Sequence, residues 1–296
     1  MSEMPKVTIC ILAYNSEKTI ADTIESCLAQ DYWNYEVAVM ENGSTDRTVE
    51  IAKSYRGINL YCWPHDIGMG KNMERCAYLG TDIIVFMCAD DIFTDSIVIR
   101  DIARIFYLHS EIKHISRWYY QFADDANVPL RANRSRNIFK LADNVSGLAF
   151  RRETLEGVEI TNDPFIEGAS LLMGISDLRS MTLRYDTVAI RMGNGGSQTA
   201  AAFRIAPTRR WYGLVGNQPF LKDASIGYIQ IKNWGTYRVL IDEIMFSVKL
   251  NPVILLRIDF WFFALSALLI PRKILRKLVD FYKNQIGRRV TKRKWR

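Results

Sequence analysis

The sequence predicts an α/β protein built on a doubly wound, mostly parallel sheet, and three observations support this fold class. Short apolar runs alternate with segments of helical periodicity across residues 7–95, which is the βαβαβαβ pattern of a parallel sheet. Polar loops follow the apolar runs, as they do at the strand ends of such sheets. The chain has 296 residues, 49% of them hydrophobic, which is ample sequence to bury a core.

The first half of the chain supplies four expected strands and the three helices between them. Ile20, Ile24 and Leu28 recur at helical spacing and share one helix face. The expected strands are Val7–Ala13, Tyr35–Met40, Ile58–Cys62 and Ile83–Met87, and the expected helices are Glu17–Ala29, Arg47–Tyr55 and Gly70–Leu79.

The alternation loosens after residue 110, and no internal repeat or low-complexity linker is present. Aromatic and apolar runs still predict strands, and one apolar segment after a proline predicts a helix. In order, we expect a strand at Ser116–Phe122, a basic polar loop at Arg131–Asn137, an apolar segment at Val145–Phe150, a helix at Pro164–Ile175, a strand at Arg184–Arg191 and a glycine-rich loop at Gly193–Thr199.

The C-terminal region differs in kind from the rest. Val253–Ile270 is an apolar run between two prolines, but it contains Arg257 and Asp259. Two charges in so short a run argue against an unaided membrane span. Apolar residues at helical spacing then alternate with basic ones from Ile274 to Ile286, which fits a helix in a membrane interface. A helix docked on the protein's own body beside a solvated basic tail is the alternative.

The positive charge of the chain is confined to its end. Residues 271–296 hold eleven Lys and Arg against Asp280 alone, a net charge of +10, while the whole chain is +7, which leaves residues 1–270 at −3. A slightly acidic body excludes a basic groove for nucleic acid. The sequence therefore predicts no nucleic-acid partner.

Cysteine and histidine usage restricts the chemistry further. Five cysteines lie in the first third without a C-x-x-C pair, which indicates free thiols in a reducing compartment. The three histidines leave little material for a zinc site or a Ser-His-Asp triad. Met1 to Pro5 lead directly into a strand without a signal peptide, so we expect a cytoplasmic location.

Two adjacent carboxylates end the fourth expected strand. Asp90 and Asp91 follow the apolar run Ile83–Met87, at the strand end where open α/β sheets bind their ligands. Two adjacent carboxylates repel each other unless a cation neutralises their charge. One interpretation is therefore a site for a hard cation that carries a phosphate. The other is a solvated turn in which Thr94 or Asp95 caps the next helix.

The first 95 residues, taken together, resemble the opening of family 2 glycosyltransferases. The resemblance rests on a tyrosine–asparagine turn, a polar loop, a later glycine–asparagine segment and the paired aspartates. It is strong over residues 5–95, fair to about residue 200, and faint beyond. The residues that carry it are Ala13-Tyr14-Asn15, Ser26, Leu28, Gln30, Tyr32, Glu36, Glu41 to Thr48, Asp66-Ile67-Gly68 with Asn72, and Asp90-Asp91.

The resemblance implies the GT-A fold, a nucleotide-sugar donor and transfer with inversion at the anomeric carbon. It implies a divalent metal, Mn²⁺ or Mg²⁺, held by Asp90 with support from Asp91. Lys71 and Arg191 are candidates to stabilise the diphosphate. The residues expected to bind the nucleotide-sugar are Ala13, Tyr14, Asn15, Glu41, Asn42, Gly70, Lys71, Ala89, Asp90 and Arg191.

Three positions depart from the family pattern. Where the family often has two acids in its second loop, this chain has Glu41 and the amide Asn42. Cys88 stands where the family's Asp-x-Asp motif has its first acid, and a protonated thiol is a poor ligand for a hard cation. The family's catalytic "ED" pair matches Glu167, but Gly168 replaces its second acid. We expect Glu167 to be the general base and Asp163 the reserve. The alternative is that Glu167 only stabilises a helix, because its negative charge interacts favourably with the positive end of the helix dipole.

These observations predict a GT-A domain at residues 1–235 and a helical, basic, amphipathic region at residues 236–296. Within the first, residues 1–110 form the nucleotide-sugar half and residues 111–235 the acceptor half. The predicted function is an inverting glycosyltransferase at the inner face of the cytoplasmic membrane, acting on a lipid-linked saccharide of a surface polysaccharide. A non-catalytic GT-A protein that binds a nucleotide or a partner is the alternative, and a nucleotidyltransferase is disfavoured because no glycine-rich basic loop follows Leu12.

Overall fold

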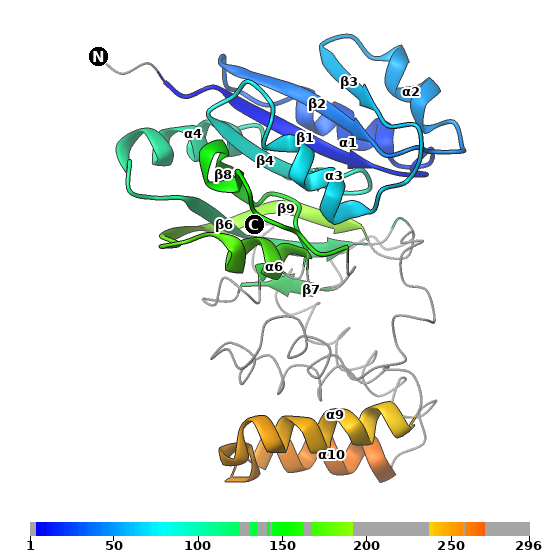
Figure 1. Ribbon diagram of the computed structural model, residues 1–296, viewed down its shortest axis with the longest axis vertical. Helices are drawn as coiled ribbons and strands as arrows, with labels where there is room; N and C mark the ends of the chain where they lie inside the picture. The colour runs from blue at the N-terminus through cyan, green and yellow to red at the C-terminus, as the bar shows by residue number, and fades with distance from the viewer. Residues whose placement is uncertain are drawn as a thin grey trace, which may run out of the picture. The chain divides into compact units, whose positions relative to one another are not determined.

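Figure 1 shows the computed structural model of the chain, which forms two compact units, residues 1–194 and 195–296. The structure describes residues 4–122, 124, 131–134, 141–142, 144–162, 167–191, 237–256 and 258–269. The domain boundary predicted after residue 235 stays a prediction.

Four parallel strands form the first half of the sheet, in the order β3-β2-β1-β4. They span β1 Val7–Ala13, β2 Tyr35–Glu41, β3 Ile58–Cys62 and β4 Ile83–Cys88. Ile9 in β1 lies opposite Val37 in β2 and Val85 in β4. The four expected strands and their parallel pairing are confirmed.

The second half of the sheet mixes strand directions. It continues from β4 through β8, β6, β9 and β5, and β7 pairs with β6. Only the β6–β9 pair is parallel among these, and β8, β5 and β7 run antiparallel to their neighbours. The bounds are β5 Ile92–Phe93, β6 His114–Phe122, β7 Arg131–Asn133, β8 Ala149–Arg151 and β9 Ser180–Arg191.

One expectation about this half is wrong. Residues 131–133 were expected at the start of a polar loop, yet they form β7. Tyr119 and Tyr120 of β6 pair with Asn133 and Ala132 of β7, and the Asn133 side chain donates to the Tyr119 hydroxyl at 2.8 Å. Pairing with a neighbouring strand therefore overrides the polar composition of a three-residue segment.

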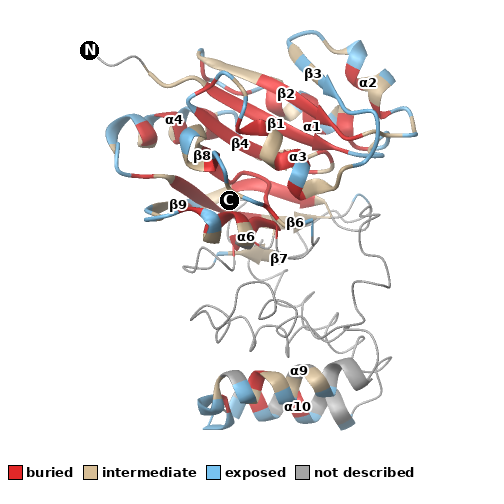
Figure 2. Cartoon of the chain, viewed as in Figure 1, coloured by how far each residue is buried: buried red, intermediate tan, exposed pale blue. Residues whose placement is uncertain are grey.

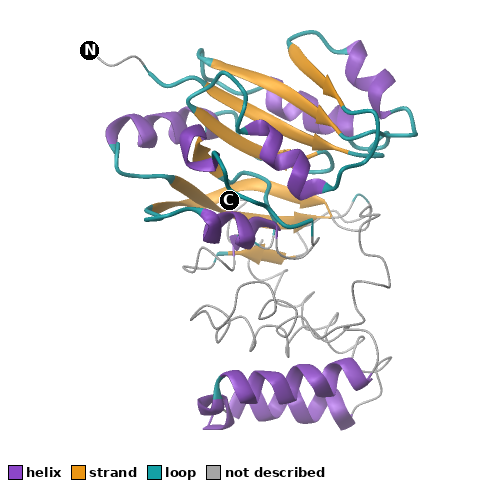
Figure 3. Ribbon diagram, viewed as in Figure 1, coloured by secondary structure: helices purple, strands orange, loops and turns teal. Residues whose placement is uncertain are grey.

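Helices cover both faces of the sheet, as a doubly wound fold requires (Figures 1 and 3). Alternate residues of β1 and β4 point to opposite faces. One set packs with α1 (Ile20–Leu28) and α4 (Val98–Leu108), and the other with α3 (Met69–Cys76) and α6 (Glu167–Gly174). Helix α2 (Thr48–Ser54) and the 3-10 helix η1 (Arg152–Leu155) complete the described helices of this unit.

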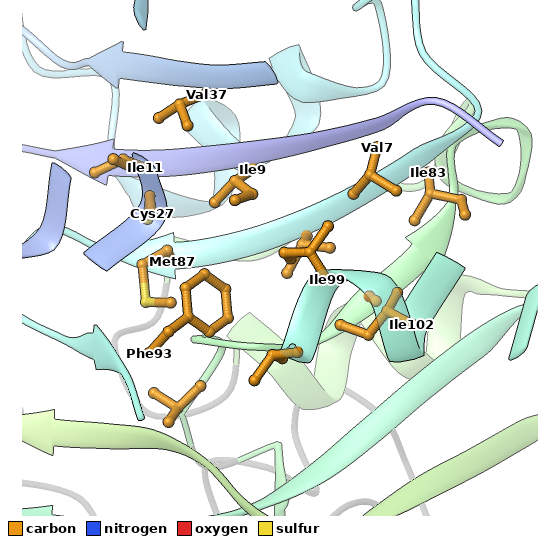
Figure 4. Packing of buried hydrophobic residues seen from close by; sticks show 14 of the residues in the cluster. Val7, Ile9, Ile11, Cys27, Val37, Ile83, Met87, Phe93, Ile99 and Ile102 are labelled. Carbon is orange, nitrogen blue, oxygen red and sulfur yellow. The ribbon is translucent and has the colours of Figure 1, made fainter. Parts of the chain in front are cut away.

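The central strands are buried on both faces of the sheet (Figure 2). Figure 4 shows Ile9 and Ile11 of β1 with Cys27 of α1 and Ile99 and Ile102 of α4. Each of these five side chains is fully buried, and burying one large aliphatic side chain stabilises a fold by about 2 kcal/mol. The two-sided core fixes the strands and, with them, the loops at their carboxyl ends.

The described part of the second unit is a helical hairpin of α9 (Tyr237–Leu250), the 3-10 turn η2 (Pro252–Leu256) and α10 (Ile258–Leu269). Its core contains Ile254, Phe260 and Ala264. The apolar run Val253–Ile270 is therefore not one continuous helix, because η2 takes up its first residues. None of the helices among the described residues combines the length and apolar character needed to cross a membrane. The predicted amphipathic segment 274–286 lies outside the described residues.

Candidate functional site

The carboxyl ends of β1, β2 and β4 meet at one edge of the sheet. Ala13 lies opposite Glu41, and Leu12 lies opposite Cys88. Backbone bonds continue this alignment past the strands, because Asn42 N–H donates to Ala13 C=O and Ala89 N–H donates to Leu12 C=O. The structure thus brings together three of the predicted groups: residues 13–15, residues 41–42 and residues 89–91.

The turn after β1 is built around Asn15. Its backbone is left-handed, with φ +47°, a conformation that asparagine tolerates better than most residues. Asn15 N–H donates to Ser44 Oγ at 2.9 Å, and Asn15 Oδ1 accepts from Thr45 N–H at 2.8 Å. The Asn15 side chain therefore holds the next loop in place, while Tyr14 keeps 45% of its surface exposed.

The loop after β2 folds over a buried carboxylate. Glu41 is 1% exposed, and its two oxygens accept the N–H groups of Gly43 and Ser44 at 3.1 and 2.5 Å. Gly43 has φ +76°, and a Cβ there would lie 2.4 Å from the backbone of His65. A glycine is therefore needed at this turn. Each Glu41 oxygen retains a second lone pair for a nucleobase or ribose donor.

Two other residues fix the borders of this loop. Asn42 Nδ2 donates to Asp66 Oδ1 at 2.5 Å, and Asn42 Oδ1 accepts from Ile67 N–H at 3.2 Å. At the far end, Asp46 accepts hydrogen bonds from Thr48 and from the Glu17 amide. Burial alone would raise the pKa of Asp46, but these hydrogen bonds outweigh it and lower the pKa.

Gly70 and Lys71, both predicted to bind the donor, lie at the start of α3 against the segment before α6. A Cβ at Gly70 would lie 2.4 Å from Thr161 O, so this glycine permits the close approach of two backbones. Asn162 Oδ1 accepts from Lys71 N–H, and Asn162 Nδ2 donates to Ile67 C=O. The Lys71 ammonium pairs with Glu74 at 2.8 Å, so a diphosphate would compete with this carboxylate.

The turn after β4 gathers three metal-ligating groups. Ligand atoms of Cys88, Asp90 and Asp91 all lie within 4.8 Å of one another. Burial and the neighbouring Asp90 raise the pKa of Asp91 to about 7, and burial also raises the pKa of Asp90. Burial, Asp91 and Asp90 raise the pKa of the Cys88 thiol. Two carboxylates fit a hard cation such as Mn²⁺ or Mg²⁺, whereas a protonated thiol does not.

The two aspartates have different surroundings. Asp91 is 1% exposed; its Oδ2 accepts from Ser146 Oγ at 2.5 Å and from Asn144 Nδ2 at 3.3 Å, and its Oδ1 accepts from Arg191 N–H at 2.8 Å. Asp90 is half-buried, and no other described residue donates a hydrogen bond to its carboxylate. Asp90 is thus the better placed of the two to bind a cation directly.

Sequence reasoning missed the loop that holds Asp91. Ser146 Oγ also accepts from Cys88 N–H at 2.9 Å, which joins this loop to the metal turn twice. The fully buried Arg117 of β6 donates to the carbonyls of Leu141, Asn144 and Ser146. Nothing in the sequence around Asn144 and Ser146 distinguishes them from an ordinary turn, because their partners lie far away along the chain.

Arg191 ends β9 beside the metal turn, and its guanidinium is already paired. Nε donates to Asp90 C=O at 3.0 Å, NH2 contacts Asp22 at 2.6 Å and NH1 contacts Asp124. Its side chain is 7% exposed. Arg191 therefore braces the backbone of the metal turn, and a donor diphosphate would have to share it with two carboxylates. The predicted loop at residues 193–199 lies outside the described residues.

Glu167, the predicted base, begins α6 and is 6% exposed. Its charge acts in the same direction as those of Asp91 and Asp90 in raising the pKa of Cys88, so Glu167 lies within electrostatic reach of the metal turn. A Cβ at Gly168 would lie 2.4 Å from Ala142 O. Steric exclusion by the Ala142 backbone therefore explains why a glycine, and not a second acid, follows Glu167. Asp163, the reserve, lies outside the described residues.

Known proteins that resemble this chain in sequence are glycosyltransferases. Residues 8–149 match the family model described as glycosyl transferase family 2. A putative glycosyltransferase, EpsE of Bacillus subtilis, is 46% identical over 55 residues, which cover 19% of this chain and 20% of EpsE. The UDP-Glc:alpha-D-GlcNAc-diphosphoundecaprenol beta-1,3-glucosyltransferase WfaP of Escherichia coli is 36% identical over 75 residues, which cover 25% of this chain and 30% of WfaP.

The crystal structure of S. aureus TarS 1-349 in complex with UDP-GlcNAc is similar in fold. It superposes with a TM-score of 0.57 at 16% identity, covering 88% of this chain and 79% of TarS 1-349. At that identity the likeness shows the fold alone, and the expected GT-A fold is confirmed. The EpsE and WfaP matches span less than a third of the length of either relative.

Proposed function

The chain belongs to glycosyl transferase family 2 through residues 8–149, and from this premise we propose that it is an inverting glycosyltransferase. Its donor is a nucleoside-diphosphate sugar, and its acceptor is a hydroxyl group of a lipid-linked saccharide. The observation that carries the proposal is the alignment of three strand ends, β1, β2 and β4, around residues 13–15, 41–42 and 88–91.

Each strand end has a separate task in this proposal. Tyr14 offers an exposed ring for stacking on the nucleobase, and Glu41 offers its free lone pairs to donors on the base or ribose. Asp90 holds a divalent cation, with Asp91 behind it. When bound, the cation stabilises the negative charge of the departing nucleoside diphosphate. Lys71 and Arg191 are the proposed cationic partners of that anionic charge.

Glu167 is the proposed general base. Inverting transfer needs one group that takes the proton of the acceptor hydroxyl as that hydroxyl attacks the anomeric carbon. The buried carboxylate at the start of α6, within electrostatic reach of the metal turn, supports this assignment. Because Gly168 leaves no room for a second acid, Glu167 acts without a neighbouring carboxyl.

The acceptor assignment rests on the name of one relative and on the C-terminal sequence. WfaP is named for transfer to a diphosphoundecaprenol-linked sugar. This chain carries +10 of net charge in residues 271–296, which suits contact with anionic lipid on the cytoplasmic membrane face. We place the enzyme there, as a peripheral protein that meets a lipid-linked acceptor of surface polysaccharide synthesis.

The test begins with a panel of nucleotide-sugars, scored by thermal stabilisation with and without Mn²⁺. With the donor identified, Asp90→Ala should abolish its turnover, while Asp95→Ala, at an exposed aspartate of the same segment, should leave it intact. Undiminished turnover in Asp90→Ala would refute the metal assignment. Glu167→Gln should keep donor binding and lose transfer by about 10²-fold or more.

A non-catalytic protein of the same fold is the second candidate, and the departures at Cys88 and Gly168 favour it. It predicts donor binding without transfer to any saccharide acceptor. In that case Glu167→Gln would behave like the wild type in every assay, because no proton transfer depends on the carboxylate.

A further inference from the structure

The helical hairpin carries an unusual amount of exposed apolar surface. On α10, Ile258, Trp261, Leu265 and Leu269 are 88%, 46%, 47% and 76% exposed. They are spaced by three, four and four residues, so they form one stripe along the helix. Phe260 and Ala264 of the same helix are buried in the hairpin core.

The hairpin turn η2 and the helix α9 also expose apolar side chains. The exposed members outside α10 are all aliphatic or thioether side chains: Ile241, Met245, Val253, Leu255 and Leu256. Leu256 is 84% exposed. Trp261 Nε1 donates to Leu255 C=O at 2.8 Å, which fixes the indole ring beside the turn and satisfies its only donor.

The first unit exposes a different kind of apolar side chain. Its exposed large apolar residues, among those described, are Tyr14, Trp33, Tyr61, Trp63, Tyr78, Tyr107 and Leu108. All but Leu108 carry a hydroxyl or indole N–H that water can satisfy. Single amphipathic residues of this sort are normal on a protein surface. A stripe of four exposed apolar side chains on one helix, three of them aliphatic, is less common, and it marks an interaction surface.

The sequence next to the stripe indicates what covers it. Two residues after Leu269, the chain enters residues 271–296, with a net charge of +10. A partner must therefore offer an apolar layer next to dense negative charge. A bilayer with anionic headgroups has both, and apolar residues with a tryptophan beside basic residues are the features of interfacial helices.

We propose that the stripe formed by Ile258, Trp261, Leu265 and Leu269, with the adjoining turn residues Val253, Leu255 and Leu256, inserts into the interface of an anionic bilayer. The net charge of +10 in residues 271–296 favours anionic over neutral lipid. This inference deepens the proposed membrane contact. It assigns the apolar part of that contact to α10 and its turn rather than to residues 274–286.

The test uses the full chain and vesicles of phosphatidylcholine with and without phosphatidylglycerol. The double variant Ile258→Glu/Leu265→Glu places charges at two exposed positions, so the hairpin core is left intact. We expect its affinity for anionic vesicles to fall about tenfold or more in sedimentation, because two insertion points are lost. The matched control is Leu108→Glu, a 60% exposed leucine of the first unit, which should bind as the wild type does.

Three outcomes would overturn the inference. In the first, the double variant binds with wild-type affinity and deletion of residues 271–296 abolishes binding. That result would assign the membrane contact to charge alone. The second is no wild-type binding to anionic vesicles. The third is a concentration-dependent dimer in light scattering that the double variant abolishes, which would mean that a second copy covers the stripe. Each leaves the sugar-transfer proposal standing, because none measures transfer.

Discussion

Glu41 and Asp91 are two buried carboxylates at the same edge of the sheet, yet they are held in opposite ways. Each is 1% exposed. Glu41 accepts from backbone N–H groups two and three residues ahead. Asp91 accepts from partners 53, 55 and 100 residues away. One carboxylate shapes a single loop, whereas the other joins β4, the loop at residues 144–146 and β9.

This difference between local and long-range hydrogen bonds indicates which parts of the site are most sensitive to substitution. A local loop can be perturbed without moving the rest of the sheet, since its hydrogen bonds close within a few residues. The junction at Asp91 fails if any of three distant segments shifts. We therefore expect matched substitutions to cost more in the long-range region than in local turns.

The largest effect is expected at Gly168. Gly168→Ala would place a Cβ 2.4 Å from the backbone oxygen of Ala142, and a backbone atom cannot move aside as a flexible side chain does. We expect a loss of about 2–4 kcal/mol in the free energy of unfolding, measured in urea. The control, Gly80→Ala, meets nothing within 4 Å and should change stability by less than about 0.5 kcal/mol. Equal effects at both glycines would contradict the close approach of α6 to Ala142.

The next effect compares two serines. Ser146→Ala removes the donor to Asp91 and leaves the buried Cys88 N–H without its acceptor. Such losses cost about 2–3 kcal/mol together. Ser44→Ala removes only an acceptor for Asn15 N–H in an exposed turn, which should cost about 0.5–1 kcal/mol. If Ser44→Ala proved the more harmful in urea unfolding, the contrast between the two carboxylates would be wrong.

The third comparison concerns pH and another long-range contact. Burial and the nearby Arg117 lower the pKa of His114 to about 3. The unfolded chain binds a proton near pH 6.5 and the folded chain does not, so this histidine's contribution to stability is complete above pH 6.5 and declines as the pH falls toward 3.

The expected slope is up to about 1.4 kcal/mol per pH unit below 6.5. His114→Phe should flatten that part of the stability–pH curve, since Phe150 already stacks on the ring at 4.7 Å. An unchanged slope in His114→Phe would mean that His114 takes up its proton alike in the folded and the unfolded chain, which contradicts this account.

The same contrast explains how far the sequence could predict the molecule. The strand Val7–Ala13 was predicted to the residue, because a buried parallel strand is a continuous apolar run. The glycine at position 43 and the loop to Asp46 are local turn chemistry, so their shape was open to prediction. Both signals reside within a few neighbouring residues.

What could not be predicted depends on residues brought together from far apart. The roles of Ser146 and Arg117 arise only when β8 lies beside β4 and β6 lies beside β8. The pairing of Arg191 with Asp22 spans 169 residues, and no periodicity in the sequence records it. The steric need for Gly168 likewise depends on the backbone of Ala142. A departure from a family motif can therefore have a structural cause that only the fold discloses.

The central claim is that Asp90 holds the cation that binds the donor's diphosphate at the edge shared by β1, β2 and β4. Calorimetry of UDP and GDP binding, with and without Mn²⁺, tests it most directly. The account predicts that the wild type binds one of these nucleotides in a Mn²⁺-dependent manner and that Asp90→Ala loses this dependence, while Asp95→Ala keeps it. Unchanged Mn²⁺-dependent binding in Asp90→Ala would contradict the claim.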